Sequence, residues 1–206
     1  DGDHYIVIEP NSDEGIAFVE IDPEKKEITG YNPVNRIYQG YGKEAGFSGH
    51  FVIQLNEEIA DYGVWDSTTI TSGRKSAKGQ KHAVGAWIKL ASDKPGKTLV
   101  KVATSFTSID NARKNLASEI PEWDFNEVRQ ASSDTWNQAL GQIAVKGNNE
   151  KEMVKFYSAL YNAHFLPRTF SDVDGSYPRF DGDGQIMKMD HGTYYCDFSQ
   201  WDTYRA

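Results

Sequence analysis

Trp201 and Asp202 are the residues whose types and spacing best suit a defined chemistry. They lie in the segment DFSQWDTYRA, where Asp197 and Ser199 are N-cap residue types and a helical spacing follows. An indole can stack on the apolar face of a pyranose, and the neighbouring carboxylate can accept hydrogen bonds from two adjacent hydroxyls. The helix dipole also favours an aspartate in a first turn, so the pair indicates a sugar site only weakly by itself.

A second segment rich in carboxylates is FSDVDGSYPRFDGDG, residues 170–184. Read from Asp172 as a calcium-binding EF-hand loop, it has Tyr177 where the loop needs glycine and Asp183 where it needs a bidentate glutamate. Asp172 and Asp174 are spaced to share one face of an extended chain, as paired glycosidase carboxylates could, but nothing in the sequence raises either pKa. We therefore favour a series of Asx and glycine turns over a metal site or a catalytic pair.

The remaining reactive residue types form no recognisable site. The five histidines are scattered without metal-ligand spacing, and Cys196, the single cysteine, has no evident base beside it. One cysteine also excludes an internal disulfide, so the redox compartment stays open. We predict no catalytic residue and no metal ligand within these 206 residues.

The composition limits the partners that the chain can have. A net charge of −8 argues against nucleic acid and anionic membranes, which attract clustered lysine and arginine. No apolar run approaches the ~20 residues of a membrane span. Aromatic residues make up 13% of the chain, which suits either sugar stacking or, more commonly, a β-rich core. The sequence begins at Asp1 without a signal peptide, which leaves open a cytosolic protein or a targeting segment outside this sequence.

The first half of the chain has the alternation of strands and the second half has the spacing of helices. Alternating apolar residues predict strands over 5–8, 16–21, 25–30, 50–55, 84–90 and 100–106. Ser108, Asp124 and Asn149 are then candidate N-caps of three helices, and Pro121 ends the first. Segregated strands and helices predict an α+β chain, with an antiparallel β-sandwich portion followed by helices. The polar, basic stretch 71–79 is interpreted as a solvated hairpin tip.

Six segments in the second half of the chain form a recognisable series. They are SIDNA (108–112), WDF (123–125), WNQAL (136–140), FYSALY (156–161), FSDVDG (170–175) and FSQWDTYR (198–205). Together, and in this order, they resemble glycoside hydrolase family 92, a family of calcium-dependent, exo-acting, inverting α-mannosidases, many of them bacterial and exported. The resemblance is dense from about Ser105 to Ala206 and weaker over the strands.

The resemblance implies a domain plan for the chain. Residues 1–107 would belong to an N-terminal β-sandwich domain, 108–147 to a helical linker, and 148–206 to the start of a truncated catalytic (α/α)6 barrel that packs against its own sandwich. The chain would then contain only the first helix of that barrel. The general acid, the base and the calcium ligands of the family would all lie beyond Ala206.

The resemblance also implies a role for one segment of this chain. Asp202 would hold hydroxyls of the terminal mannose of a glycan, and Trp201 and Arg205 would shape the pocket. The whole protein would be a periplasmic or secreted α-mannosidase, and this chain alone would be inactive. Two alternatives stay open, namely a carbohydrate-binding β-sandwich without activity, and another glycosidase or phosphorylase that joins a sandwich to a helical barrel.

Overall fold

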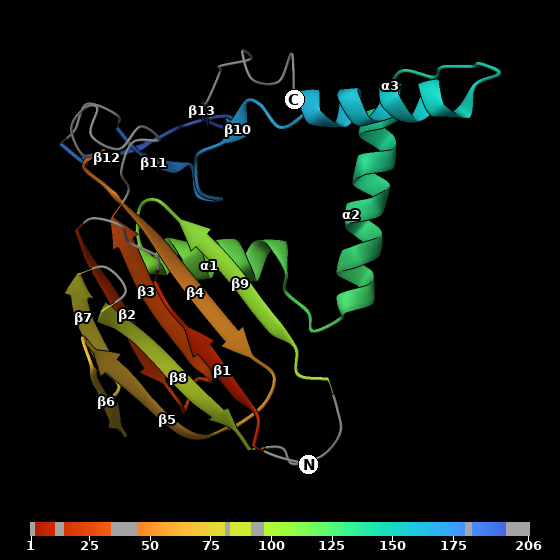
Figure 1. Cartoon of the computed structure of the whole chain (residues 1–206). Helices are drawn as coiled ribbons and strands as arrows, with labels where there is room; N and C mark the ends of the chain where they lie inside the picture. Colours follow the sequence, from red (N-terminus) through yellow and green to blue (C-terminus); the bar gives the residue numbers. More distant parts are fainter. Residues whose placement is uncertain are drawn as a thin grey trace. The chain divides into compact units, whose positions relative to one another are not determined.

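The computed structural model describes residues 3–10, 15–33, 45–80, 83–91, 97–179 and 183–196 (Figure 1). Its contacts divide the chain into two compact units. The first, which we call the sandwich unit, comprises residues 1–123 and 171–191. The second, the helical unit, comprises residues 124–170 and 192–206. The chain therefore leaves the sandwich unit and returns to it once.

Nine strands build the two antiparallel sheets of the sandwich unit. The five-stranded sheet has the order β7-β2-β3-β4-β9, with β7 (Ser76–Gln80), β2 (Ile16–Asp22), β3 (Glu27–Pro33), β4 (Ser48–Leu55) and β9 (Val100–Ser105). The four-stranded sheet has the order β1-β8-β5-β6, with β1 (Tyr5–Ile8), β8 (Val84–Leu90), β5 (Ile59–Asp66) and β6 (Thr69–Ser72).

The main hydrophobic core lies between the two sheets. Alternation along each strand sends every second side chain inward, so β2 contributes Val19 and Ile21 and β8 contributes Ala86 and Ile88, all fully buried. Burying one such aliphatic side chain stabilises the fold by roughly 1.5–3 kcal/mol. The other face of each sheet points away from this core.

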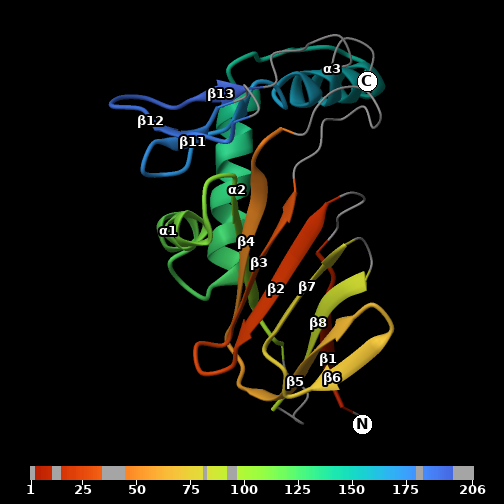
Figure 2. The same ribbon diagram turned by 90° about the vertical axis from the view of Figure 1, so that its left-hand side faces the viewer.

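The helix α1 (Ile109–Glu119) covers the outer face of the five-stranded sheet, so the layers follow the order helix, five strands, four strands (Figure 2). The Ser108 side chain caps it by accepting a hydrogen bond from the backbone N–H of Asn111. Ala112 and Leu116 then pack on Val52 of β4 in a second, smaller core.

Two buried charged residues fix α1 on this sheet. The Lys101 ammonium on β9 donates to the carbonyls of Ile120 and Pro121, at 2.9 and 2.8 Å, just after the helix ends. Arg113 on the helix donates to the carboxylate of Glu27, which is only 3% exposed. Each contact satisfies polar groups that the fold takes out of water.

Residues 171–191 return to the sandwich unit as a turn followed by a small hairpin. Its strands are β11 (Ser176–Pro178) and β12 (Ile186–Lys188), which pair antiparallel. Gly175 has a φ of +84°, which a residue with a side chain rarely adopts, and its N–H bonds to the carbonyl of Asp172. The interpretation of residues 170–184 as a series of turns holds around Gly175, but Ser176–Pro178 forms a strand, and residues 180–182 lie outside the described residues.

The helical unit contains α2 (Phe125–Leu140) and α3 (Glu150–Ala163), with β10 (Arg168–Thr169) paired to β13 (Tyr195–Cys196). The Asp124 and Asn149 side chains cap the two helices as predicted. Trp136 of α2 packs against Tyr161 of α3, with ring centroids 4.4 Å apart. Neither helix has a buried residue. No helix in the described part of the chain is long and apolar enough to cross a membrane.

The predicted α+β class and the change from sheet to helix after residue 106 are confirmed. Three of the nine strands in the two sheets, β5, β6 and β7, were not predicted, and neither were the four short strands β10 to β13. Ser76–Gln80 in particular lies in the stretch interpreted as a hairpin tip, but it pairs with β2 as an edge strand, which leaves only Gly73 to Lys75 between β6 and β7. The domain boundaries at residues 107 and 147 stay predictions.

Candidate functional site

The best-defined polar cluster in the described residues surrounds Asp172, whose side chain belongs to the returning segment and is only 8% exposed. Four side chains from β9, α1 and the turn between them donate hydrogen bonds to its two carboxylate oxygens: Ser105 Oγ (2.8 Å), Thr107 Oγ1, Asn111 Nδ2 (3.1 Å) and Asn115 Nδ2 (2.8 Å). Asn115 also accepts a hydrogen bond from the backbone N–H of Val173. We call this cluster the Asp172 anchor.

The sequence builds this anchor from local features of three elements. Ser105 ends β9, Thr107 follows it, and Asn111 and Asn115 lie four residues apart, which places them on one face of α1. The strand end, the turn and the helix therefore bring the four donor side chains together around the Asp172 carboxylate. A carboxylate oxygen has about two acceptor positions, so three donors on Oδ2 and one on Oδ1 leave little capacity for another ligand.

Asp174, two residues on, has a different environment. Its carboxylate accepts hydrogen bonds from the Lys114 ammonium at 2.9 Å and from the backbone N–H of Ser176 at 3.1 Å. Partial burial raises the pKa of Asp174, but these hydrogen bonds and the Lys114 charge outweigh it and lower that pKa to about 2. Asp174 is thus a poor proton donor near neutral pH, and the prediction that the pair is not catalytic stays a prediction.

Neither carboxylate fits a calcium ion. Calcium takes six to eight oxygen ligands, whereas Asp172 faces N–H and O–H donors and Asp174 faces an ammonium group. The described residues also contain no group of three or more histidine, cysteine, aspartate or glutamate side chains that could hold a metal ion. The calcium that the family resemblance implies therefore has no site in this part of the chain.

His50 on β4 is a half-buried titratable group near the anchor. It pairs with Ser105 in the strand register, and its Nδ1 atom has no hydrogen-bond partner within the described ranges. Burial lowers the pKa of His50, and the nearby Asp172 charge opposes that effect only in part. The imidazole packs edge to face against the Tyr31 ring, with centroids 5.8 Å apart, so we assign His50 a packing role in the sheet.

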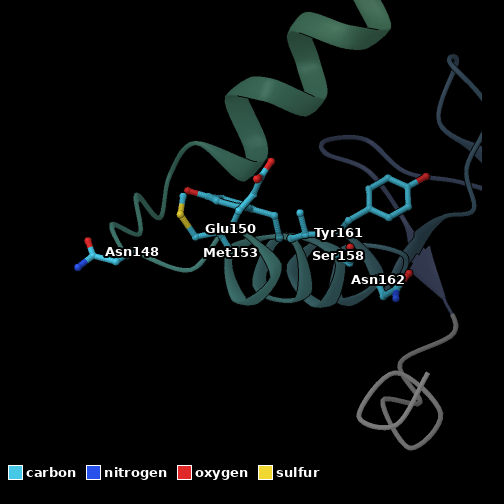
Figure 3. Close-up of a pocket in the computed structure, with 9 residues that line it drawn as sticks. Asn148, Glu150, Met153, Ser158, Tyr161 and Asn162 are labelled. Atoms are coloured by element: carbon cyan, nitrogen blue, oxygen red, sulfur yellow. The ribbon is translucent and has the colours of Figure 1, made fainter.

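An open groove of about 860 Å³ runs along α3 (Figure 3). Apolar and aromatic side chains dominate it, among them Met153, Val154 and Tyr161. Its polar neighbours Asn148, Glu150 and Asn162 are spread along the helix rather than gathered at one point. The groove thus has the character of a packing surface rather than of a site that orients a small ligand.

The residues predicted to bind sugar, Trp201, Asp202 and Arg205, lie outside the described residues, which end at Cys196. The last described element before them is β13, in which Tyr195 pairs with Thr169 and Cys196 with Arg168. Their roles stay predictions. Sequence reasoning noted Asp172 but missed its four donors, because these lie 57 to 67 residues away along the chain.

Comparison with protein families gives two matches in sequence order. Residues 1–105 match the N-terminal domain of glycosyl hydrolase family 92, and residues 111–206 match the catalytic domain of the same family. One curated relative is an uncharacterized secreted glycosidase from Arthroderma benhamiae, 32% identical over 119 residues, which are 56% of this chain and 14% of that protein.

Solved structures agree with these matches. A family 92 inverting mannosidase from Bacteroides thetaiotaomicron superposes with a TM-score of 0.81 and 25% identity, over 99% of this chain and 27% of its own. A family 92 α-mannosidase from the same organism shares the fold, with a TM-score of 0.75 at 24% identity over 98% of this chain and 29% of its own. This chain thus spans about a quarter of those structures, and it belongs to glycosyl hydrolase family 92.

Proposed function

We propose that this chain is part of a glycoside hydrolase that removes terminal α-linked mannose from glycans with inversion at the anomeric carbon. The observation that carries the proposal is the match of the two halves of the chain, in order, to the two domains of one glycosidase family. The likeness to a structure titled as an inverting mannosidase, over almost the whole of this chain, supports the substrate and the stereochemistry.

Inversion requires a protonated acid for the leaving oxygen and a carboxylate base for water, roughly 6.5–9.5 Å apart. Asp172 and Asp174 do not make such a pair, because Asp172 is enclosed by donors and a pKa of about 2 excludes Asp174 as the protonated acid. The proposal therefore assigns both catalytic carboxylates to the part of the enzyme after Ala206. Calcium, which would act on the sugar hydroxyls, is assigned to ligands in that same part.

The contribution of this chain to the reaction is to hold the terminal sugar. In the proposal, the Asp202 carboxylate accepts hydrogen bonds from mannose hydroxyls, Trp201 stacks on the ring, and Arg205 supports the pocket. Such contacts matter for rate, because a sugar displaced by ~1 Å from its reactive position can cost about a hundredfold. We further propose that the sandwich packs on its own catalytic domain and that the enzyme is secreted or periplasmic, as the name of the curated relative suggests.

The test is the substitution Asp202→Asn in the full-length enzyme, assayed on an α-linked mannobiose. Asparagine keeps the shape but removes a charged acceptor worth roughly 1.5–3 kcal/mol, so kcat/KM should fall about ten- to two-hundred-fold with little change in melting temperature. Asp190→Asn, at an exposed aspartate of the returning segment, is the matched control and should leave kcat/KM unchanged.

Two results would contradict the proposal. Near-normal kcat/KM in the Asp202→Asn enzyme would remove this residue from the sugar pocket. Steady release of mannose by the purified 206-residue chain would show that the catalytic pair lies within it, against the assignment made above.

A further inference from the structure

The outer face of the four-stranded sheet carries a row of exposed apolar side chains. Tyr5 and Val7 on β1 are 53% and 65% exposed, and Ile70 on β6 is 71% exposed. Between them lie two tryptophans, Trp87 on β8 and Trp65 on β5, both partly exposed. Alternation places all five on the face opposite the core, whose inward residues are Ile6, Val64, Ala86 and Ile88.

The strand register makes these five side chains neighbours. Trp87 lies between Val7 of β1 and Gly63 of β5. Trp65 lies between Gly85 of β8 and Ile70 of β6. The Tyr5 ring meets the Trp87 ring edge to face, with centroids 6.0 Å apart. We call these five side chains the aromatic platform.

Glycines opposite the two tryptophans allow the indoles to lie down on the sheet. A Cβ atom at Gly63 would be 2.7 Å from Trp87 Nε1, and one at Gly85 would overlap the ring carbons of Trp65. Each indole therefore covers the backbone of a glycine in the next strand. Any larger residue at these two positions would lift the ring off the sheet.

This arrangement leaves one buried polar group without a hydrogen bond within the described chain, which the packing of the rings does not explain. The Trp87 indole N–H is buried against the sheet and has no hydrogen-bond partner in the part of the chain that the structure describes. A buried donor without an acceptor destabilises a fold, and unsatisfied groups in native proteins concentrate where function requires them. The ring carbons, rather than the N–H, are what the indole offers to solvent.

Polar side chains border the platform. Lys89 lies between Tyr5 and Asp61 in the register and forms an ion pair with Asp3 at 2.8 Å. Ser72 lies opposite Gly63 at the β6 side. Flat rings bordered by charged and hydroxyl groups complement a pyranose, which has an apolar face of C–H groups and a rim of hydroxyls.

We propose that the aromatic platform is a carbohydrate-binding surface that stacks pyranose rings of a glycan. The choice of a mannose-containing glycan as its ligand rests on the proposed function. A second copy of the chain is the weaker candidate, because a stable dimer buries about 800 Å² and roughly 20–30 residues per partner, whereas five side chains form this platform. A sugar needs contact with only a few aromatic rings, which this platform supplies.

The test is native gel electrophoresis of the 206-residue chain in gels that contain soluble yeast α-mannan or, separately, the β-glucan laminarin. We expect at least one polysaccharide to retard the chain. Trp65→Ala and Tyr5→Ser should each weaken the retardation about two- to tenfold, the effect expected for losing one stacked ring. Phe125→Ala removes a 66% exposed aromatic side chain of the helical unit and should migrate like the unaltered chain.

Tyr5→Ser guards against a folding artefact, because its side chain is more than half exposed and its loss should leave the melting temperature unchanged. No retardation of the unaltered chain by either polysaccharide would overturn the proposal. Equal retardation of all variants would do so as well. A dimer in sedimentation that Ile70→Lys dissociates, without retardation by sugar, would assign the platform to a second copy instead.

Two further results separate this proposal from the proposed function. Retardation by laminarin alone would keep the platform as a sugar site and end its link to mannose. Retardation of the chain together with a full-length enzyme that releases no mannose would contradict the proposed function and leave the platform standing. Retardation of the chain but not of the full-length enzyme would show the platform to be covered there, and would overturn it as a binding surface.

Discussion

Asp172 shows how a single side chain can hold a long connection in place. Its carboxylate collects hydrogen bonds from a strand end, a turn and a helix, although it lies 57 to 67 residues further along the chain. All four side-chain donors are neutral, so the anchor does not rely on an opposite charge. Removing the acceptor takes one partner from each of these donors, and among the described residues only the contacts to Thr107 and to the carbonyl of Thr104 remain for Ser105, Asn111 and Asn115 as donors.

We therefore expect Asp172→Ala to lower the free energy of unfolding of the sandwich unit by roughly 2–4 kcal/mol. Denaturant titration followed by tryptophan fluorescence would measure the change. Asp190→Ala, an exposed aspartate of the same returning segment, is the control and should change stability by less than about 0.5 kcal/mol. Equal stability of the two variants would show that the anchor is not stabilising.

Asp174 gives the fold an acid-sensitive contribution. Its pKa is about 2 in the folded chain against 3.8 for a free side chain, so the folded state binds its proton less readily than the unfolded state. The resulting stability is fully present above pH ~4 and is lost as the pH falls from about 4 to 2. Asp174→Asn should therefore be less stable than the unaltered chain at pH 6, with a difference that shrinks by pH 2.5. Urea titrations at both pH values would measure the free energy of unfolding, with Asp190→Asn as the control. A difference between Asp174→Asn and the unaltered chain that is the same at both pH values would contradict the prediction.

At the scale of elements, α1 depends on groups outside its own sequence. The carbonyls after its last turn are satisfied by Lys101 from β9, whose ammonium also lies 4.3 Å from the centre of the Trp123 ring. Lys101 itself is only 8% exposed, so its ammonium needs these acceptors, and the contact ties the chain just after α1 to the sheet. We call this contact the Lys101 cap.

Lys101→Met should test this cap. Methionine keeps much of the length and the apolar stem but cannot donate, so unfolding should become easier by about 1–3 kcal/mol. Lys97→Met, at an exposed lysine just before β9, should change stability by less than about 0.5 kcal/mol. Hydrogen exchange of the last α1 amides should accelerate in Lys101→Met only, and an unchanged rate would argue against the cap.

The sequence was informative where the signal is local. Ser108, Asp124 and Asn149 predicted three helix starts, because an N-cap acts on backbone only two or three residues away. Strand β7 was missed, since SAKGQ has no apolar alternation and forms a strand only by pairing with β2 some sixty residues earlier. The Asp172 anchor was missed for the same reason. Residue types alone indicated a sugar site at Trp201 and Asp202 only weakly, and the roles predicted for them and for Arg205 rest on the family resemblance.

At the scale of the whole molecule, the two units differ in how well they are packed. The sandwich unit has a core of fully buried aliphatic side chains, whereas α2 and α3 have no buried residue and α3 carries an open apolar groove. The mannosidase structure that this chain resembles over 99% of its length is almost four times as long, so most of that protein has no counterpart in this chain.

This difference predicts uneven protection from hydrogen exchange in the isolated chain. Amides of α2 and α3 should exchange at least about tenfold faster than those of β2, β3 and β8, because opening the helices exposes little buried surface. Mass spectrometry of peptic fragments would measure both sets in one experiment. Equal protection in the two units would contradict the prediction.

The return of residues 171–191 to the sandwich unit has a consequence for the order of synthesis. When the ribosome has released the first 123 residues, both sheets and α1 are present, but the acceptor that Ser105, Asn111 and Asn115 require has not yet been made. Residues 124–170 must emerge first, so the helical segment is translated before the sandwich unit can be completed. A chain cut at Trp123 would therefore lack the Asp172 carboxylate, and as donors these three side chains would keep, among the described residues, only their contacts to Thr107 and to the carbonyl of Thr104.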